Sequence, residues 1–264
     1  MGNFIARHRR HPLVARLAKS CQRFLDRWHN VSYDMDLNGE GFVLARLAAS
    51  GHLCSAPVFD VGANVGHWTE LVKKLDPRAE VHAFEIVPET FARLRAALGA
   101  TAGVVLNNVG VGGRNGTVVV HHFPQRPGLS STVPGSGGGR TDFLEIECPL
   151  IGGGDYLRQR SIERLSLLKI DVEGGEPDVL AGFADALREG RIDAVQFEYG
   201  RINIRRRFLL ADFFDLFAGY GYRVGKIYPN YVDFRDYRVE DEDFRGPNYL
   251  AIAPAARHLV DLLR

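Results

Sequence analysis

The stretch that decides the fold is Val58-Phe59-Asp60-Val61-Gly62-Ala63-Asn64-Val65-Gly66-His67-Trp68-Thr69. An apolar run of strand type enters a turn with two glycines, and a helical pattern follows. Gly62 and Gly66 let the backbone approach a ligand in conformations that side chains resist, and the helix start offers free N–H groups. The stretch therefore predicts a loop on which a ligand carboxylate or phosphate can sit.

The loop belongs to a longer alternation of strand and helix patterns, which predicts βαβ units and a parallel sheet. Helices are expected at 39–48, 68–75, 91–98, 176–187 and 208–217. Strands are expected at 58–61, 81–86, 104–109, 117–123, 144–150, 165–170, 192–197, 223–227 and 248–252. A chain of 264 residues suits one α/β domain, because single cores stop growing near roughly 250–300 residues.

Composition excludes several classes of protein. With 33 basic and 32 acidic residues the net charge is +1, which gives no field that would favour nucleic acid. Cys21, Cys54 and Cys148 stand far apart, which argues against a disulfide framework or a structural zinc site and favours a reducing cytoplasm. No apolar run approaches the roughly 20 residues of a membrane span, and no signal peptide is expected.

Residues 1–33 predict a basic, amphipathic helical extension. Apolar positions such as Phe4, Leu17 and Trp28 recur among seven lysines and arginines. The ordinary interpretation is a helix packed on the domain with its basic face in solvent. The alternative is contact with a membrane surface or another anionic partner, which would make the protein membrane-peripheral.

The loop spacing separates two classes of nucleotide site. It reads G-A-N-x-G, whereas the dinucleotide fingerprint is G-x-G-x-x-G and needs its third glycine for helix packing. An NAD-dependent oxidoreductase is therefore disfavoured. The next strand ends at Phe84-Glu85-Ile86, so Glu85 lies at the carboxyl edge beside the loop, where an acid can accept both hydroxyls of a ribose.

Two further acids are expected at the same edge of the sheet. Asp171 and Glu198 each end a neighbouring strand, and ligands of open α/β sheets bind in the crevice at the carboxyl ends. Together they could hold Mg²⁺, or one of them could act as a general base. Glu173 is a weaker active-site candidate, whereas Glu176 fits helix-start chemistry.

Three other features invite a functional interpretation. His122, on a strand, is a candidate base, although a histidine at a strand edge is more often polar surface. The glycine-rich segment 124–140 is too long for a simple connection and predicts a mobile flap. The aromatic insertion 228–237 could stack on sugar rings, and it could equally close a core or form the contact of a homodimer.

These residues resemble the FkbM family of S-adenosylmethionine-dependent methyltransferases. The resemblance extends over about residues 34–252 and is densest at 60–69, 83–88, 108–112 and 168–176. One departure is Gly110, where the family often has alanine.

The resemblance implies a class I, Rossmann-like domain over 34–264, with a seven-stranded, mostly parallel sheet and helices on both faces. It implies transfer of a methyl group from S-adenosylmethionine, with magnesium as a further candidate cofactor. By analogy, the residues around Gly62 face the methionine half of the cofactor, Glu85 the ribose, and Asn108 with Val109 the adenine. The full set of cofactor positions is Asp60, Gly62, Asn64, Gly66, Thr69, Glu85, Ile86, Asn108, Val109 and Asp171.

The expected activity is O-methylation of a sugar, a glycan or another polyhydroxylated small molecule. A hydroxyl oxygen would attack the methyl group in line, with Asp171, Glu198 or His122 as catalytic candidates and Asp171 and Glu198 as metal ligands. One alternative is N-methylation of an amine, which would need neither a metal nor a strong base. Another is a non-catalytic Rossmann-like module that binds a partner.

Overall fold

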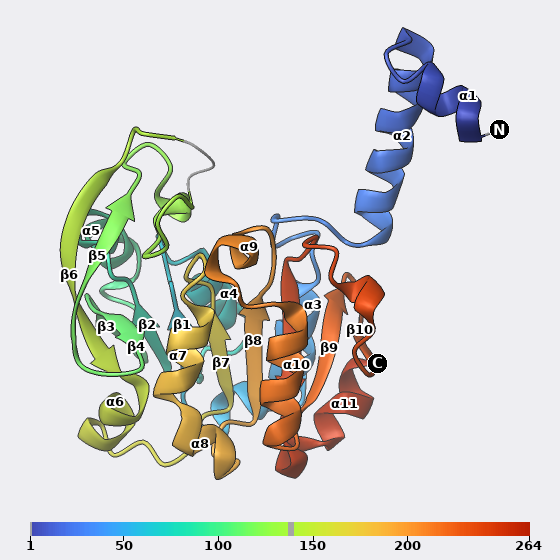
Figure 1. The fold of residues 1–264 in the computed structure, drawn as a ribbon. Coiled ribbons are helices and arrows are strands. Elements are labelled where there is room, and N and C mark those ends of the chain that lie inside the picture. Colours follow the sequence, from blue (N-terminus) through green and yellow to red (C-terminus); the bar gives the residue numbers. More distant parts are fainter. Residues whose placement is uncertain (1, 137–139) are drawn as a thin grey trace.

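A mostly parallel β-sheet forms the centre of the protein (Figure 1). The computed structural model describes residues 2–136 and 140–264, and within these it contains one sheet of eight strands. From one edge to the other the strands are β10 (Tyr231–Phe234), β9 (Arg223–Tyr228), β11 (Asn248–Ile252), β8 (Ala194–Glu198), β7 (Leu167–Ile170), β1 (Val58–Val61), β2 (Val81–Phe84) and β3 (Val104–Asn107). The expected α/β class is confirmed.

The sheet is parallel through its centre and antiparallel at one side, where it has one strand more than expected. β11 runs antiparallel to both of its neighbours, and β10 pairs antiparallel with β9, while the strands from β8 to β3 are mutually parallel. Seven strands were expected, and the extra one is β10, which the sequence suggested as an aromatic insertion. Its Phe234 is buried in the core, and Tyr231 stacks on Tyr228 with ring centroids 4.9 Å apart.

The central strands are buried along their whole length. Every residue of β1, β2 and β7 is buried, as expected for parallel strands covered on both faces. β1 pairs with β2 on one side and β7 on the other, with Asp60 between Ala83 and Lys169. Because these strands end together, the residues that follow them meet at one edge of the sheet.

Helices cover both faces of the sheet. α7, α8 and α10 lie in front in Figure 1, while α3 and α4 lie behind, with α11 packed beside α3. The helices of the body are α3 (Glu40–Ala49), α4 (His67–Leu75), α5 (Pro88–Leu98), α6 (Gly153–Gln159), α7 (Glu176–Gly182), α8 (Ala184–Arg188), α9 (Ile202–Arg206), α10 (Leu210–Gly219) and α11 (His258–Leu263). The single helix expected at 176–187 is two helices that meet at Phe183. The preceding Gly182 packs so closely on Gly112 that a Cβ would overlap its carbonyl oxygen.

A second, three-stranded sheet stands beside β3. It contains β4 (Gly110–Gly112), β6 (Leu144–Gly152) and β5 (Gly116–His122) in that order. The strand expected at 104–109 therefore ends at Asn107, and the chain then crosses into this smaller sheet. The segment predicted as a flap follows β5. It contains a short 3-10 helix at Pro127–Leu129, while residues 137–139 lie outside the described part of the chain.

The N-terminal segment forms two helices, α1 (Gly2–Arg7) and α2 (Pro12–Trp28), and α2 projects away from the body (Figure 1). No residue of α2 is buried, so the expectation that this helix packs on the domain is wrong. Contact with the body follows directly after α2, where His29 Nδ1 lies 3.5 Å from Asp243 Oδ2 and the Asn30 side-chain amide donates to the carbonyl oxygens of Asn38 (2.7 Å) and Ile227 (2.9 Å).

Candidate functional site

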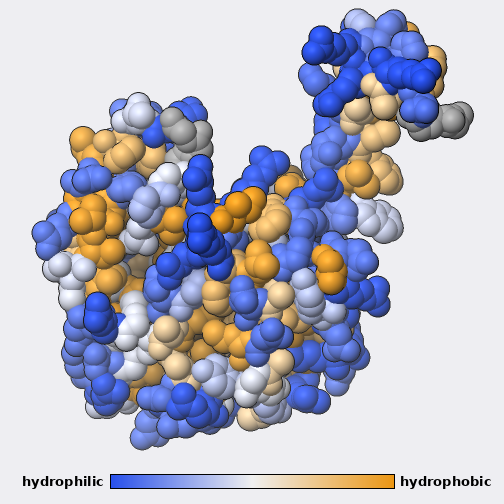
Figure 2. Space-filling view, viewed as in Figure 1, coloured by the Kyte–Doolittle hydropathy of each residue, from blue (hydrophilic) through white to orange (hydrophobic). Residues whose placement is uncertain are grey.

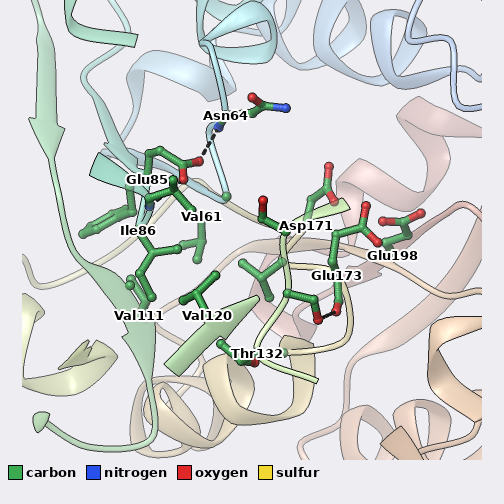
Figure 3. Close-up of a pocket in the computed structure, with 18 of the residues that line it drawn as sticks. Val61, Asn64, Glu85, Ile86, Val111, Val120, Thr132, Asp171, Glu173 and Glu198 are labelled. Carbon is green, nitrogen blue, oxygen red and sulfur yellow. Dashed lines mark hydrogen bonds between the residues drawn. The ribbon is translucent and has the colours of Figure 1, made fainter. Parts of the chain in front are cut away.

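A cavity of about 700 Å³ opens at the carboxyl edge of the sheet, within the size range of small-molecule sites (Figure 3). One wall, here called the loop half, is formed by Gly62, Asn64, Glu85, Ile86 and Val109. The opposite wall, the acidic half, is formed by Asp171, Glu173 and Glu198. The cavity thus brings together seven of the positions proposed from the sequence, Gly62, Asn64, Glu85, Ile86, Val109, Asp171 and Glu198, together with the weaker candidate Glu173.

Glu85 is fixed by the backbone around it. Its carboxylate accepts the N–H of Asn64 at 2.9 Å, in the glycine loop, and the N–H of Val87 at 2.8 Å (Figure 3). Burial raises the pKa of Glu85, while these two hydrogen bonds act in the opposite direction. The bonds hold the side chain on the cavity wall, where it can still accept hydrogen bonds, because a carboxylate offers about four lone-pair sites.

The glycines of the loop serve packing as well as access. Gly62 has φ +86°, and a Cβ there would overlap the carbonyl oxygen of Asp171, so the loop and the strand end of β7 touch through their backbones. Gly66 has φ +99° and lies against α5, where a Cβ would meet Leu94 and Leu98 at 2.8 and 2.7 Å. Gly66 does not line the cavity, so the structure assigns it to helix packing.

Asp60 and Thr69 lie behind the loop and are fully buried. The Thr69 hydroxyl donates to Asp60 Oδ2 at 2.7 Å, and Asp60 Oδ1 lies 3.2 Å from Lys169 Nζ. Both were expected to contact the cofactor, but neither lines the cavity. Their side chains instead connect β1 with α4 and β7, which keeps the loop in place.

Lys169 is a central residue that sequence reasoning missed, although it lies inside the quoted 168–176 motif. Its ammonium lies between Asp60 and Asp171 Oδ2, 3.3 Å from the latter, and 3.4 Å from the carbonyl oxygen of Gly62. Burial alone would lower the pKa of Lys169, but the two carboxylates raise it above its ordinary value, so the lysine stays charged. Lys169 itself does not line the cavity, but its ion pair with Asp171 holds that carboxylate on the cavity wall.

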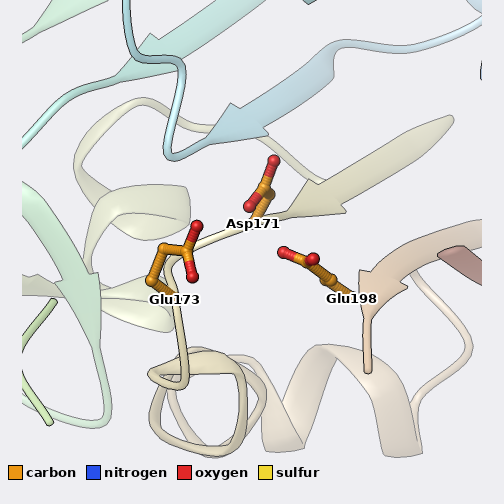
Figure 4. Close-up of side chains that lie close together, drawn as sticks. All are labelled: Asp171, Glu173 and Glu198. Atoms are coloured by element: carbon orange, nitrogen blue, oxygen red, sulfur yellow. The ribbon is translucent and has the colours of Figure 1, made fainter. Parts of the chain in front are cut away.

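The three carboxylates of the acidic half point toward one another (Figure 4). One oxygen from each of Asp171, Glu173 and Glu198 lies within 4.8 Å of the others. Burial, the charge of Asp171 and that of Glu176 raise the pKa of Glu173 to about 8. Burial, reinforced by Asp171 and Glu173, likewise raises the pKa of Glu198. Glu173, a weaker active-site candidate in the sequence, thus lies where a third ligand beside Asp171 and Glu198 would lie.

Glu176 shapes the loop that carries Glu173. Its Oε1 accepts the backbone N–H groups of Val172 (3.1 Å) and Gly174 (3.2 Å), while its Oε2 is buried with no partner among the described residues. Burial raises the pKa of Glu176 to about 7. The first-turn role expected for Glu176 agrees with its position at the start of α7.

A further acid, Glu40 at the start of α3, also lines the cavity. It accepts hydrogen bonds from the side-chain amides of Asn38 (2.7 Å) and Gln196 (2.6 Å), and burial raises its pKa. The sequence predicted a helix at 39–48, and Asn38-Gly39-Glu40 lies within the stretch that resembles the family, but neither Asn38 nor Glu40 was proposed as a site residue. The pattern Asn38-Gly39-Glu40 was the available signal, but nothing in it shows that α3 begins beside the cavity.

Two proposed site residues lie off the cavity wall. Asn108 Nδ2 donates to the carbonyl oxygen of Glu85 at 2.8 Å, so it supports the end of β2 from behind. His122 is buried, and its ring faces Ser130 Oγ at 3.0 Å and Glu89 at 3.5 Å. These contacts hold the flap segment, and His122 does not reach the acidic half as the proposed base would have to.

The same flap segment closes one side of the cavity. The Ser131 hydroxyl donates to the carbonyl oxygen of Glu173 at 2.6 Å, and Ser130, Ser131 and Thr132 all line the cavity. Apolar side chains complete the wall beyond Glu85, namely Ile86, Val109, Val111, Val120 and Leu150. The cavity therefore has an apolar end, a carboxylate at its middle and an acidic end.

The model of the family described as "Methyltransferase FkbM domain" matches residues 60–224, which is more than half of the chain and includes both halves of the cavity. The chain belongs to the FkbM methyltransferase family. The resemblance seen in the sequence is thereby confirmed.

Curated relatives match this chain over part of their own length. The 31-O-demethyl-FK506 methyltransferase FkbM of Streptomyces tacrolimicus is 33% identical over 49% of this chain and 60% of its own. Methyltransferase 1 of Beauveria bassiana is 28% identical over 48% and 58%. The hexuronic acid methyltransferase AglP of Haloferax volcanii is 25% identical over 72% and 76%. The chain thus spans less than two thirds of the length of the first two relatives.

A solved FkbM structure is also similar. The methyltransferase FkbM of Methylobacillus flagellatus aligns over 75% of this chain and 44% of its own, with 14% identity and a TM-score of 0.46.

Proposed function

We propose that the protein transfers a methyl group from S-adenosylmethionine to a hydroxyl oxygen of a sugar or another polyhydroxylated acceptor. The observation that carries the proposal is the division of one cavity into a loop half centred on Glu85 and an acidic half of three carboxylates. The family supports methyl transfer. Two relatives are named as a hexuronic acid methyltransferase and a 2-O-methyltransferase, which supports a hydroxyl acceptor.

The loop half fits the cofactor. The apolar end of the cavity next to it, with Ile86, Val111 and Val120, suits a purine ring. The Glu85 carboxylate suits the two hydroxyls of a ribose. When bound, S-adenosylmethionine supplies a methyl group on a positively charged sulfur. The acidic half then lies beyond the ribose position, and its negative charge favours a cationic group nearby.

The acidic half fits the acceptor. An acceptor hydroxyl placed among Asp171, Glu173 and Glu198 loses its proton to a carboxylate as its oxygen bonds to the methyl carbon and the carbon–sulfur bond breaks. A carboxyl group whose pKa is raised above its usual range, as for Glu173 and Glu198, is a stronger proton acceptor once ionised and suits this proton transfer. Alignment contributes more than the base, because oriented reactants gain roughly 7–11 kcal/mol.

The same carboxylates fit a magnesium ion, which prefers oxygen ligands. Asp171, Glu173 and Glu198 offer one oxygen each within 4.8 Å of one another, and together they have enough negative charge for a divalent cation. A cation there would make the acceptor hydroxyl easier to deprotonate. Methylation of an amine would need neither this cation nor a strong base, so the acid cluster favours the hydroxyl.

The test is calorimetric titration of the full chain with S-adenosylhomocysteine and, separately, with NAD, followed by a screen of sugars with radiolabelled S-adenosylmethionine. Binding of S-adenosylhomocysteine alone and label transfer to a hydroxyl acceptor would support the proposal. Preference for NAD would overturn it, and so would a folded protein that binds neither ligand, which would favour a binding module. The rate of label transfer is then measured with EDTA and again with excess Mg²⁺. A rate that EDTA abolishes and Mg²⁺ restores indicates a cation, and an unchanged rate indicates a carboxylate base.

A further inference from the structure

The projecting helix α2 leaves a broad apolar face uncovered. Leu13, Leu17, Phe24 and Trp28 are 66, 63, 67 and 69% exposed, although their spacing places them within one side of the helix. Figure 2 shows hydrophobic and strongly hydrophilic residues together along this stalk. In α3, by contrast, Val43, Leu44 and Leu47 are fully buried. An apolar stripe of this kind marks a surface that binds something.

The flank of α2 next to this apolar face is cationic. At 100° per residue, Arg16, Lys19, Arg23 and Arg27 form one sector beside the apolar face. Residues 1–33 contain seven of the chain's 33 lysines and arginines, and one of its 32 acids. The remainder therefore has 26 basic and 31 acidic residues, so the stalk is positive and the body negative.

We propose that α2 lies in the surface of an anionic lipid bilayer, with its apolar face in the acyl boundary and its cations among the headgroups. Helices that combine a Trp, Phe and Leu face with a Lys- and Arg-rich polar face bind membranes in this way. None of the helices that the structure describes is long and apolar enough to cross a membrane, so the helix would lie on the bilayer.

Charge decides between a bilayer and a second copy of the chain as the occupant. Two copies of α2 packed face to face would bring two strongly cationic segments together, which opposes association. An anionic leaflet attracts the same cations, each contributing roughly 1 kcal/mol near the surface. The negative body would be repelled by that leaflet, so the stalk would make the contact.

The proposed binding of α2 to a membrane would also bring the cavity near the membrane surface. α2 ends at Trp28, the Asn30 side chain is hydrogen-bonded to the body, and Tyr33 already lines the cavity. In Figure 1, α2 at the upper right and the flap segment at the upper left extend from the same side of the body. The wall of the cavity therefore begins a short stretch of chain beyond the membrane-binding element. This inference does not depend on the reaction proposed above.

The experiment is co-sedimentation of the full chain with vesicles of phosphatidylcholine, with and without about one quarter phosphatidylglycerol. Intrinsic fluorescence supplies a second readout, because the chain has two tryptophans and Trp68 is only 5% exposed. We expect binding to the anionic vesicles only, a blue shift of the Trp28 emission, and loss of binding at high salt. Trp28→Phe should remove the shift.

Matched variants separate the cationic face from total charge. Arg16→Glu/Arg23→Glu should weaken binding to anionic vesicles by at least about twentyfold. Lys74→Glu/Arg158→Glu has the same change of charge on exposed positions of α4 and α6, and should bind as the wild type does. Circular dichroism confirms that both variants are folded.

Three outcomes would overturn the inference. The first is no sedimentation of folded protein with anionic vesicles. The second is equal weakening by the two charge-reversed pairs. The third is self-association in the ultracentrifuge without lipid that Leu17→Ser/Phe24→Ser abolishes, because the apolar face would then belong to a second copy of the chain.

Discussion

The two halves of the cavity lie at one sheet edge, one with a single carboxylate and the other with three, and these carboxylates are held in opposite ways. In the loop half, each oxygen of Glu85 accepts a backbone N–H group. In the acidic half, Asp171, Glu173 and Glu198 face one another. Among the described residues the one cation within salt-bridge distance of these three is Lys169, which touches Asp171.

This difference in hydrogen bonding indicates which half of the cavity gains electrostatic energy when a ligand binds. A polar group that already has partners keeps its position whether or not a ligand is present, so the loop half is preorganised. Carboxylates that raise one another's pKa keep unfavourable electrostatic energy that a proton, a cation or an acceptor hydroxyl can relieve. The loop half is thus suited to recognition, and the acidic half to chemistry.

The largest expected effect is on the junction of the two halves. Gly62→Ala should lower the free energy of unfolding by at least about 4 kcal/mol, because its Cβ would overlap the Asp171 carbonyl at a φ of +86°. Gly51→Ala is the matched control: φ is +74° and nothing lies within 4 Å, so only about 1 kcal/mol should be lost. Urea denaturation measures both. Equal losses would mean that the two halves are not joined through this contact.

The next effect separates chemistry from recognition. Glu198→Gln should lower kcat for methyl transfer by about 10²–10⁴-fold, because it removes a proton acceptor or a cation ligand. The affinity for S-adenosylhomocysteine should change by less than roughly threefold. Glu147→Gln, an exposed acid of β6, is the control. A parallel loss of affinity would show that the acidic half also recognises the cofactor.

The same comparison explains what the sequence could predict. Local patterns determine the loop half: the strand, the glycine turn and the acid after the next strand placed Gly62, Asn64 and Glu85 correctly on one wall. The parallel strand ends also placed Asp171 and Glu198 together. These predictions follow from the geometry of βαβ units, which relates position in the sequence to position on the sheet edge.

Contacts between distant segments were not predictable. Glu173 joins the acidic half because the loop before α7 turns back at a positive φ of 51°, and Glu40 arrives from α3. Gly66, Asp60 and Thr69 fit the ligand motif, but their side of the loop faces α5, α4 and Lys169. A motif identifies which segment binds, and packing decides which of its residues face the ligand.

A smaller effect should follow in the loop half itself. Glu85→Gln should weaken binding of S-adenosylhomocysteine about 30-fold, or roughly 2 kcal/mol. In place, the glutamine side chain would direct its NH₂ group at one of the two backbone N–H donors. If it turned away, it would lose its hydrogen bond to a ribose hydroxyl. Glu70→Gln, an exposed acid of α4, is the matched control. Calorimetric titration measures both variants. Unchanged affinity in Glu85→Gln would remove Glu85 from the proposed ribose site.

The smallest effect concerns Glu176, which combines features of both halves, with backbone donors on one oxygen and no partner on the other. Burial raises its pKa from the ordinary 4.5 to about 7 in the folded protein. The folded state therefore holds the proton more tightly than the unfolded state, and this contribution to stability is complete below pH 4.5 and is lost as the pH rises through about 7.

Glu176→Gln removes this titration while leaving an oxygen for the Val172 and Gly174 N–H groups. Relative to the wild type, the variant should gain at least about 1 kcal/mol of unfolding free energy between pH 5 and pH 8. Urea denaturation at the two pH values measures the difference, and Glu70→Gln should show no such gain. The charge of Glu176 also raises the pKa of Glu173, so the measured difference contains a smaller change in Glu173 that acts in the same direction. A difference that stays constant with pH would mean that the buried oxygen has found a partner, and that the acidic half is better compensated than its geometry indicates.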